Sequence, residues 1–458
     1  MLIDFTVSNF LSFSDEETFS LGAGKARKFH ERIYNDKKVK LTKCEVIFGA
    51  NASGKSNLIS AFQFVQNMIR SGLPRGFSNK YFRLSPSFKD KPSIFRIKLL
   101  CDSQIYTYQF SIVLSAGRIV SEQLYENTGN SKRFLYERNT NSQQFTVGPY
   151  FRDLNVITKL KNYGEDSVTD EDVLFLSLIC KNKDKMFADY PDLQILRKIF
   201  DWFVNKLNIS FPSSILTGYP YFIDSNLEEI TCLLNALGTG ISDVKIVELP
   251  LEVVQNRIPP DVFNQIITNL EKANARERDE DGDNPGIMLR SYKEFYTFDI
   301  DKNNVVTIKT IEFSHEKPGI YFDLNEESDG TARLLDLIEI FFKVSQNRIF
   351  IIDEIDRCLH PAMTVKLIEL FLEMAKTRNT QLIITSHESR LLASEILRND
   401  EICFVTKNQD GASVINPLEK YQLRADKKVY AALFDGTIDV IPEFNNSKLN
   451  DFINIQSQ

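Results

Sequence analysis

Apolar and polar positions predict strands in the first 150 residues, helices in the middle, and alternating strands and helices near the C-terminus. Near the N-terminus, "LIDFTVS" and "ETFSL" alternate apolar with polar residues, so we expect two strands at a sheet edge. The later runs "SIFRIKLL", "QIYTYQFSIVL" and "IVSEQLYE" are typical of antiparallel strands. Between about 155 and 275, apolar residues recur mainly at helical spacing.

The C-terminal part has the pattern of a parallel sheet. After the strand patterns "EFYTFDI", "VVTIKTIEF" and "GIYFDL", the runs "TARLLDLIEIFFKV" and "PAMTVKLIELFLEMAK" predict helices around two buried strands, "RIFIID" and "QLIITS". Strands that alternate with helices through short links favour parallel pairing. A further buried strand, "KCEVIFG", lies far upstream. We therefore expect an α/β fold whose nucleotide domain is split by a helical insertion.

A glycine-rich loop follows that upstream strand, in "VIFGANASGKSNLISAF". Gly49 to Ser56 fits G-x-x-x-x-G-K-[ST], and apolar residues at helical spacing come directly after it. Glycines let backbone N–H groups turn toward phosphate oxygens, and the helix dipole adds positive potential. Lys55 is expected to reach the β- and γ-phosphates of ATP, and Ser56 to bind Mg²⁺. The expected nucleotide-binding residues of this segment are Gly49, Asn51, Ala52, Ser53, Gly54, Lys55, Ser56 and Asn57.

Two strand ends supply the remaining candidate chemistry. "RIFIIDEID" places Asp353 at the end of a buried strand, where it is expected to bind Mg²⁺, and Glu354 beside it as the base that activates water. "LIITSHES" ends a neighbouring strand with Ser386 and His387. A lone histidine there is often structural, but the position at the nucleotide crevice favours a γ-phosphate sensor. We predict Lys55, Glu354 and His387 as the catalytic residues.

A third segment, "NEESDGTARLLDL", combines a helix start with a polar cap. Serine and aspartate are preferred at helix N-termini, so Ser328 and Asp329 fit a plain helix cap. The functional interpretation is a second phosphate-binding helix N-terminus, formed by Ser328, Asp329 and Gly330.

The composition indicates a globular protein and argues against a membrane-spanning one. Of 458 residues, 43% are hydrophobic and 26% charged, as in globular proteins. The formal net charge of −7 argues against a generally basic nucleic-acid coat, although a local basic groove would not show in the total. No apolar run approaches the ~18 residues that span a bilayer. With six scattered cysteines and a strand pattern in place of a signal peptide, we expect a cytoplasmic protein with reduced, buried thiols.

Protein-bound metal sites other than that of the nucleotide are not expected. The charged stretch from Arg276 to Gly286 carries Asp279, Asp281 and Asp283, but it lacks the central glycine and the closing glutamate of a calcium loop. We expect a solvated loop there. The four histidines are not at zinc-site spacing.

These motifs resemble those of the ABC-type ATPases of the SMC, RecF and OLD group. "VSNFLSF" is similar to the N-terminal strand motif of that group, while "GANASGKSN", "ESDGTARLLDL" and "CLHP" resemble an AAA-family subgroup of bacterial abortive-infection and phage-defence proteins that includes RloA, AbiL and the AriA subunit of the PARIS system. The resemblance covers residues 1–115 and 290–435, and the helical middle only in outline. It implies an SMC/RecF-like P-loop ATPase.

In the family that the motifs resemble, two copies enclose ATP between the loop of one and the signature of the other. Carried over, Ser328 and Gly330 would contact the γ-phosphate held by Lys55 of a second copy, and Leu359-His360-Pro361 would link the two sites. Asp329 and Thr331 depart from the better-known signature, which has a glycine and an acidic or amide residue there. The Q-loop glutamine stays open, with Gln104 and Gln109 available.

The leading functional hypothesis is an ATP-gated scaffold of an anti-phage system. It would form a homodimer or a larger homo-oligomer through ATP, sense a phage protein or DNA, and control a separate effector, such as a TOPRIM-type nuclease, from the same operon. About 70 residues follow His387, fewer than a nuclease domain needs, so we expect no effector in this chain. No membrane partner is expected.

Three other functions stay open. A RecF-like DNA-repair ATPase would show DNA-stimulated hydrolysis without a partner protein. A transporter ATPase subunit would need a groove that couples it to a membrane subunit, and the insertion is oversized for such a groove. An interaction module without ATPase activity would not need intact catalytic motifs.

The expected domains are an N-terminal ATPase lobe (1–150), a helical insertion (151–289), a C-terminal ATPase lobe (290–420) and a tail (421–458).

Overall fold

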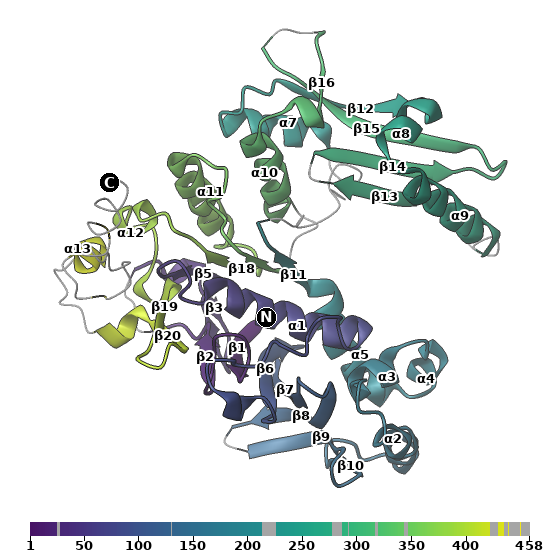
Figure 1. Ribbon diagram of the computed structural model, residues 1–458, viewed down its shortest axis with the longest axis vertical. Coiled ribbons are helices and arrows are strands. Elements are labelled where there is room, and N and C mark those ends of the chain that lie inside the picture. The colour runs from purple at the N-terminus through teal and green to yellow at the C-terminus, as the bar shows by residue number, and fades with distance from the viewer. Residues whose placement is uncertain are drawn as a thin grey trace, which may run out of the picture. The chain divides into compact units, whose positions relative to one another are not determined.

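The computed structural model describes residues 1–24, 28–129, 131–212, 226–276, 286–291, 293–316, 319–342, 347–421 and 429–434, with two single residues, Ile438 and Leu449 (Figure 1). Asp279, Asp281 and Asp283 lie outside the described residues, as does most of the expected tail. By contacts within the chain it divides into two compact units. Unit 1 comprises Met1–Ile209, Gln346–Ile355 and Glu369–Gln458, and unit 2 comprises Ser210–Ser345 and Asp356–Ile368.

Unit 1 contains an antiparallel sheet built from the N-terminal strands. Its described strands have the order β10-β9-β8-β7-β6-β1-β2. The pleat of each strand turns alternate residues to one face, and the buried positions of β6 follow this alternation from Ser93 to Lys98, whereas most residues of β7 are buried on either face. The strands are β1 (Leu2–Ser8), β2 (Glu17–Ser20), β6 (Ser93–Cys101), β7 (Gln104–Val113), β8 (Arg118–Thr128), β9 (Ser131–Asn139) and β10 (Gln144–Val147).

The second sheet of unit 1 is mainly parallel and carries the strands expected to hold the nucleotide. Its order is β11-β17-β18-β5-β19-β20, and the neighbouring pairs β17–β18, β18–β5 and β5–β19 are parallel. Strands β5, β17 and β18 are buried along their whole length, as the apolar runs predict. The bounds are β5 (Cys44–Phe48), β11 (Leu207–Ser210), β17 (Ile349–Ile352), β18 (Gln381–Thr385), β19 (Ile402–Lys407) and β20 (Ser413–Pro417).

Helix α1 (Lys55–Ser71) lies between the two sheets of unit 1 (Figure 1). It leaves the parallel sheet at β5, and its aromatic side chains pack on the antiparallel sheet. The ring of Phe62 stacks on that of Phe5 with centroids 3.8 Å apart, and Phe64 contacts Phe95 at 5.1 Å. These buried aromatic contacts hold the middle of α1 against the antiparallel sheet.

A short helical region of unit 1 is fastened to the antiparallel sheet by one buried carboxylate, that of Glu122. It accepts hydrogen bonds from the hydroxyls of Tyr108 and Tyr136, the amides of Phe175 and Leu176 and the guanidinium of Arg138. The described helices here are α2 (Leu154–Ser167), α3 (Phe175–Cys180), α4 (Asp184–Asp189) and α5 (Gln194–Asp201), followed by a π-helical turn (Trp202–Lys206). Because a buried charge needs such partners, this network fixes α3 on the sheet.

Unit 2 contains a second antiparallel sheet, of order β12-β15-β14-β13, with β16 also paired to β15. Apolar residues of α8 and α9 form a core with strands β14 and β15, in which Phe263 packs against Phe298. The elements are α7 (Leu227–Ala236), β12 (Asp243–Leu249), α8 (Leu251–Arg257), α9 (Pro260–Arg276), β13 (Gly286–Ser291), β14 (Glu294–Ile300), β15 (Val306–Ser314), β16 (Phe322–Asp323) and α10 (Asp329–Leu337).

The remaining described strands and α-helices are β3 (Tyr34–Asn35) and β4 (Lys40–Leu41), which form a small hairpin, and three C-terminal helices, α11 (Pro361–Met374), α12 (Arg390–Ala393) and α13 (Val429–Phe434). The boundary between the two units falls within α11. No helix among the described residues is long and apolar enough to cross a membrane.

Several local expectations differ from the structure. Strand β1 is not at a sheet edge, since it pairs with both β2 and β6. Alternation reports which faces are buried and says nothing about neighbours in the sheet. "GIYFDL" forms a strand only at Phe322–Asp323, and the helix expected from Thr331 turns into a 3-10 helix at Ile338–Phe341. Cys232 and Cys358 are exposed free thiols, contrary to the expectation that the cysteines are buried.

The stretch 151–289 is helical only in part, because β11, β12 and the start of β13 also fall within it. Short amphipathic segments such as "VKIVEL" are ambiguous without their pairing partner. The two compact units are defined by contacts between residues, and their boundaries differ from those of the four domains expected from the sequence.

Candidate functional site

The glycine-rich loop joins β5 to α1 and is packed tightly from behind. Gly54 has a φ of 115°, which favours glycine, and Ala52 has a φ of 63°. A Cβ atom on Gly49 would collide with the carbonyl of Val405, and one on Gly54 with the hydroxyl of Ser413. The glycines therefore let the backbone turn where side chains would not fit.

Lys55 is the first residue of α1, and its side chain folds back over the loop. Its Nζ donates hydrogen bonds to the carbonyl oxygens of Gly49, at 2.8 Å, and Ala50, at 3.1 Å. The side chain is buried, whereas Asn51, Ala52 and Ser56 are exposed. Ser53 is also buried, and its Oγ has no hydrogen-bond partner in the described structure.

Two serines from distant parts of the chain support the loop. Ser12 Oγ accepts hydrogen bonds from Asn57 Nδ2 and Ser413 Oγ, both at 2.7 Å. Ser413 Oγ also lies 2.5 Å from the carbonyl oxygen of Ser53. The side chain of Asn57 thus holds the loop through Ser12, and its expected contact with the nucleotide stays a prediction.

Asp353 and Glu354 follow β17 at the carboxyl end of the parallel sheet. Asp353 is 2% exposed, and its Oδ1 accepts a 2.6 Å hydrogen bond from Thr385 Oγ1 at the end of β18. The same hydroxyl accepts the amide of Glu354 at 2.7 Å. Glu354 is partly exposed and has a φ of 48°, a strained conformation for a residue with a side chain.

His387 lies at the neighbouring strand end, as expected. Strand β18 lies between β17 and β5, so its carboxyl end is next to those of the strands that precede Asp353 and Gly49. Ser386 is buried, and its amide donates to the carbonyl of Ile47 at 3.1 Å, while His387 is exposed. Unit 1 therefore brings the loop, the acidic pair and the histidine to one edge of one sheet.

The expected signature residues start α10 in unit 2. Ser328 is exposed and caps the helix, since its Oγ accepts the amide of Thr331 at 3.0 Å. Asp329 forms an ion pair of 3.0 Å with Lys293, whose Nζ also donates to the carbonyl of Glu327 at 2.6 Å. Lys293 thus offsets the charge of Asp329 beside the cap.

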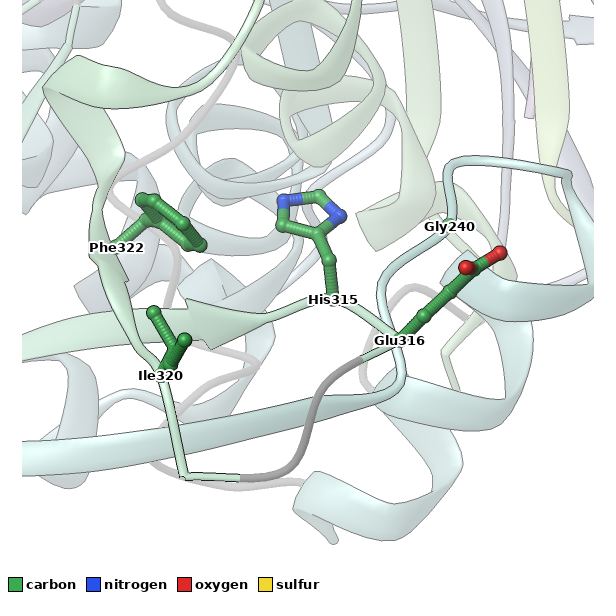
Figure 2. A pocket seen from close by; sticks show the side chains of 5 residues that line it. All are labelled: Gly240, His315, Glu316, Ile320 and Phe322. Atoms are coloured by element: carbon green, nitrogen blue, oxygen red, sulfur yellow. The ribbon is translucent and has the colours of Figure 1, made fainter.

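A hollow of about 330 Å³ opens beside the residues that precede the cap. Figure 2 shows the side chains of His315, Ile320 and Phe322 around it. His315 Nε2 lies 2.8 Å from a carboxylate oxygen of Glu327, which is the residue before Ser328. The hollow is thereby connected to the start of α10.

Gly330 and the "CLHP" segment approach each other within unit 2. A Cβ on Gly330 would lie 2.9 Å from the carbonyl oxygen of Cys358, closer than side chains tolerate. His360 caps α11, because its Nδ1 accepts the amide of Ala362 at 3.2 Å, and Pro361 occupies the first helical position. The segment thus has a local role in starting α11, and its expected link between two copies stays a prediction.

Neither candidate for the Q-loop lies on the parallel sheet. Gln104 and Gln109 are both on β7. Gln104 accepts a hydrogen bond from Lys38, and Gln109 one of 2.7 Å from Arg96. The Q-loop residue stays unassigned.

Four supporting residues were missed by sequence reasoning. Two of them lie within motifs that were already recognised. Thr385 directly precedes Ser386 at the end of the strand "QLIITS", and Ser12 lies inside "VSNFLSF". Ser413 and Lys293 carry no sequence signal, since their roles depend on segments remote in the chain.

A P-loop strand and helix, an acidic strand end beside it, and a flanking antiparallel sheet define an ABC-type P-loop ATPase fold. A family model described as "AAA domain, putative AbiEii toxin, Type IV TA system" matches residues 46–160 and 236–393. These residues are more than half of the chain, and the chain belongs to this AAA-domain family. The gap between the matched stretches lies inside the expected insertion. A search of curated proteins finds no match.

Among solved structures, SMC head domains are similar. One bound to the C-winged helix domain of ScpA shares 14% identity, with 90% of this chain and 96% of that chain covered, at a TM-score of 0.42. The head domain from Thermotoga maritima shares 13%, with 91% and 98% covered, at 0.31. A head with an extended coiled coil, bound to the C-terminal domain of ScpA derived from Pyrococcus furiosus, shares 15%, with 92% and 97% covered, at 0.38. The likeness is remote, and membership rests on the family model.

Proposed function

We propose that the chain hydrolyses ATP, with Mg²⁺, at composite sites formed by two copies, and that this cycle controls a separate toxic effector in a bacterial anti-phage system. The observation that carries the first part is the meeting of the glycine-rich loop, Asp353 with Glu354, and His387 at one edge of the parallel sheet. Ligands of α/β sheets bind outside the carboxyl ends of the strands.

The loop has the features that a phosphate needs. Its backbone can turn inward because Gly49 and Gly54 have no side chain, and Lys55 already has its ammonium over the loop carbonyls. The buried Ser53 hydroxyl without a partner is the kind of group that a bound ligand satisfies. On phosphate binding, Lys55 exchanges its bonds to the carbonyls of Gly49 and Ala50 for phosphate oxygens.

Ser56 and Asp353 would hold Mg²⁺, which when bound neutralises charge on the phosphates. Ser56 is exposed at the start of α1, and Thr385 orients the carboxylate of Asp353. Glu354 is the general base that takes a proton from the attacking water, and its partly exposed carboxylate leaves access for that water. His387 contacts the γ-phosphate and reports its presence.

The second copy contributes its signature. Ser328 is an exposed cap at a helix N-terminus, where the dipole favours an anion, and Lys293 offsets the negative charge of Asp329. Ser328, Asp329 and Gly330 would then meet the γ-phosphate bound by Lys55 of the other copy. ATP joins two copies by this contact, and hydrolysis separates them.

The biological assignment is supported by the motifs that resemble abortive-infection proteins and by the family description, which names a type IV toxin–antitoxin system. That description calls the family itself a putative toxin, whereas this proposal places the toxic activity on another chain. In this proposal the effector is a second protein of the same operon. Protection from phage should require Lys55 and that second gene together. If this chain alone protects cells, the separate-effector model is wrong.

The experiment that tests the composite site uses Glu354→Gln. The amide keeps the shape of the side chain but removes the base, so ATP should bind and remain. The variant should accumulate as an ATP-dependent dimer or larger assembly, measured as mass in solution. Adding Ser328→Arg should reverse this, because a bulky cation blocks the cap. Equal mass with and without ATP would rule out the composite site.

A further inference from the structure

Unit 1 has a second hollow, of about 470 Å³, that the nucleotide chemistry of the glycine-rich loop does not use. Its walls come from the start of β7, from β9, from the segment before α2 and from α5. Its volume is in the range of pockets that enclose small organic ligands, roughly 300–1,000 Å³. It is therefore large enough for one nucleotide.

Aromatic side chains form one wall of this hollow. Tyr106 is 2% exposed and Phe151 4% exposed, so both are held rigidly. Tyr150 is partly exposed, and its hydroxyl lies 3.3 Å from that of Tyr106. The guanidinium of Arg133 lies 4.6 Å from the centre of the Tyr150 ring and donates to the Tyr150 carbonyl at 2.9 Å. The ring of Tyr150 and the guanidinium of Arg133 therefore lie together at the wall of the hollow.

Three cations line the hollow, namely Arg133, Arg152 and Lys198, together with the carboxylates of Asp102 and Asp192. Arg133 also pairs with Glu126 at 3.4 Å. Arg152 is exposed and has no ion-pair partner in the described part of the chain. Lys198 pairs with Asp102 at 2.5 Å, but both side chains are more than half exposed, at 52% and 59%. Such an exposed pair is worth little, so the ammonium can turn to a phosphate at small cost.

We propose that this hollow binds a free nucleotide. The base stacks on the face of the Tyr150 ring that the guanidinium of Arg133 does not cover, as bases stack on aromatic planes. The phosphate is bound by Arg152 and Lys198, whose positive charges match it. Asp192 and Gln194, which also line the hollow, supply an acceptor and an amide for the base edge.

The site has a physical connection to the helix of the glycine-rich loop. Helix α5, which carries Lys198, continues into the π-helical turn Trp202–Lys206. The buried Gln66 of α1 donates to the carbonyls of Phe203, at 2.9 Å, and Leu207, at 2.6 Å. Ligand binding at α5 therefore acts on a segment hydrogen-bonded to α1.

The test uses the full chain with Lys55→Ala, which removes the other nucleotide site. Titration calorimetry with GMP, AMP and inorganic phosphate should show saturable binding of one nucleotide per chain, at least tenfold tighter than phosphate. Arg152→Glu, added to this chain, should weaken nucleotide binding at least tenfold. Its matched control is Lys185→Glu, an exposed cation of α4 outside the hollow, which should leave binding unchanged.

A second variant, Tyr150→Ala, should also weaken the nucleotide more than it weakens phosphate, with thermal melting to check the fold. Absence of saturable nucleotide binding would overturn the proposal, and so would equal binding by the Arg152→Glu chain. Equal affinity for phosphate and nucleotides would exclude base stacking. Tighter binding of a single-stranded pentanucleotide than of either mononucleotide would overturn the assignment to a free nucleotide.

Discussion

Thr385 Oγ1 donates a 2.6 Å hydrogen bond to Asp353 and accepts the amide of Glu354 at 2.7 Å. One hydroxyl at the end of β18 therefore fixes both acidic residues at the end of β17. Both strands are buried, so the arrangement is rigid. The strained φ of 48° at Glu354 is held in place by this bond and by the amide of Ile355, which donates to the Thr385 carbonyl at 3.1 Å.

Replacing that hydroxyl tests its role. Thr385→Val keeps the shape but leaves the buried carboxylate of Asp353 without this donor, at a cost of about 1–3 kcal/mol. ATP turnover should fall by about tenfold or more. Steady-state hydrolysis over a range of Mg²⁺ concentrations measures the effect. Thr385→Ser, which retains the hydroxyl, should stay close to the native rate, and equal rates for all three proteins would contradict the proposed positioning.

Two inactive variants should restore activity when mixed. Lys55→Ala removes the phosphate contact of one surface, and Ser328→Arg blocks the other, so each protein alone should be inactive. In a mixed dimer one site carries both changes while the other is native. Random exchange should restore roughly a quarter of native sites, if the sites are independent. ATPase assays on mixtures and on the separate proteins measure this, and recovery equal to zero at full exchange would argue against two independent composite sites.

The buried Glu122 should be essential for stability rather than for chemistry. In the native protein two tyrosine hydroxyls, two backbone amides and Arg138 donate hydrogen bonds to the Glu122 carboxylate. Glu122→Gln replaces this acceptor with a neutral amide, which has only one oxygen to accept them. Disrupting one partner of a buried ion pair costs about 3–5 kcal/mol. Urea unfolding should show a loss of that order. Glu165→Gln, in an exposed ion pair with Lys161, is the control and should change stability by less than about 1 kcal/mol.

Stability should fall as the pH rises toward neutrality, through Glu401. This residue is 1% exposed, and burial raises its pKa from the usual 4.5 to about 7, against the effect of the Arg398 amide that donates to it. Because the folded protein holds this proton more tightly, the contribution is complete below about pH 4.5 and is lost as the pH passes 7.

Glu401→Gln removes that titration but can still accept the Arg398 amide. The difference in unfolding free energy between native protein and variant, measured from pH 4.5 to 8, should change in favour of the variant as the pH rises. Burial raises the pKa of Glu45 as well, and the nearby Glu401 carboxylate raises it further, so the difference measures the titration of Glu401 together with its effect on Glu45. A difference that does not depend on pH would contradict the prediction.

Local sequence was sufficient for the elements that carry the chemistry. The apolar runs of β5, β17 and β18, the glycines of the loop and the helical spacing of α1 each lie within about 20 consecutive residues. Because short-range backbone preferences and burial patterns decide such segments, their positions and the edge at which they end could be predicted. The helix cap at Ser328 could also be predicted, because it depends only on neighbouring residues.

Contacts between remote segments could not be read in this way. Ser12, Ser413 and Asn57 form one network although about 400 residues separate the first two, and Lys293 meets Asp329 only because β13 and β14 bring the chain back to α10. The interior position of β1 depends on which strands pair with it. A side chain's partner is chosen by the packing of the whole unit, and an amphipathic pattern specifies a buried face without specifying what covers it.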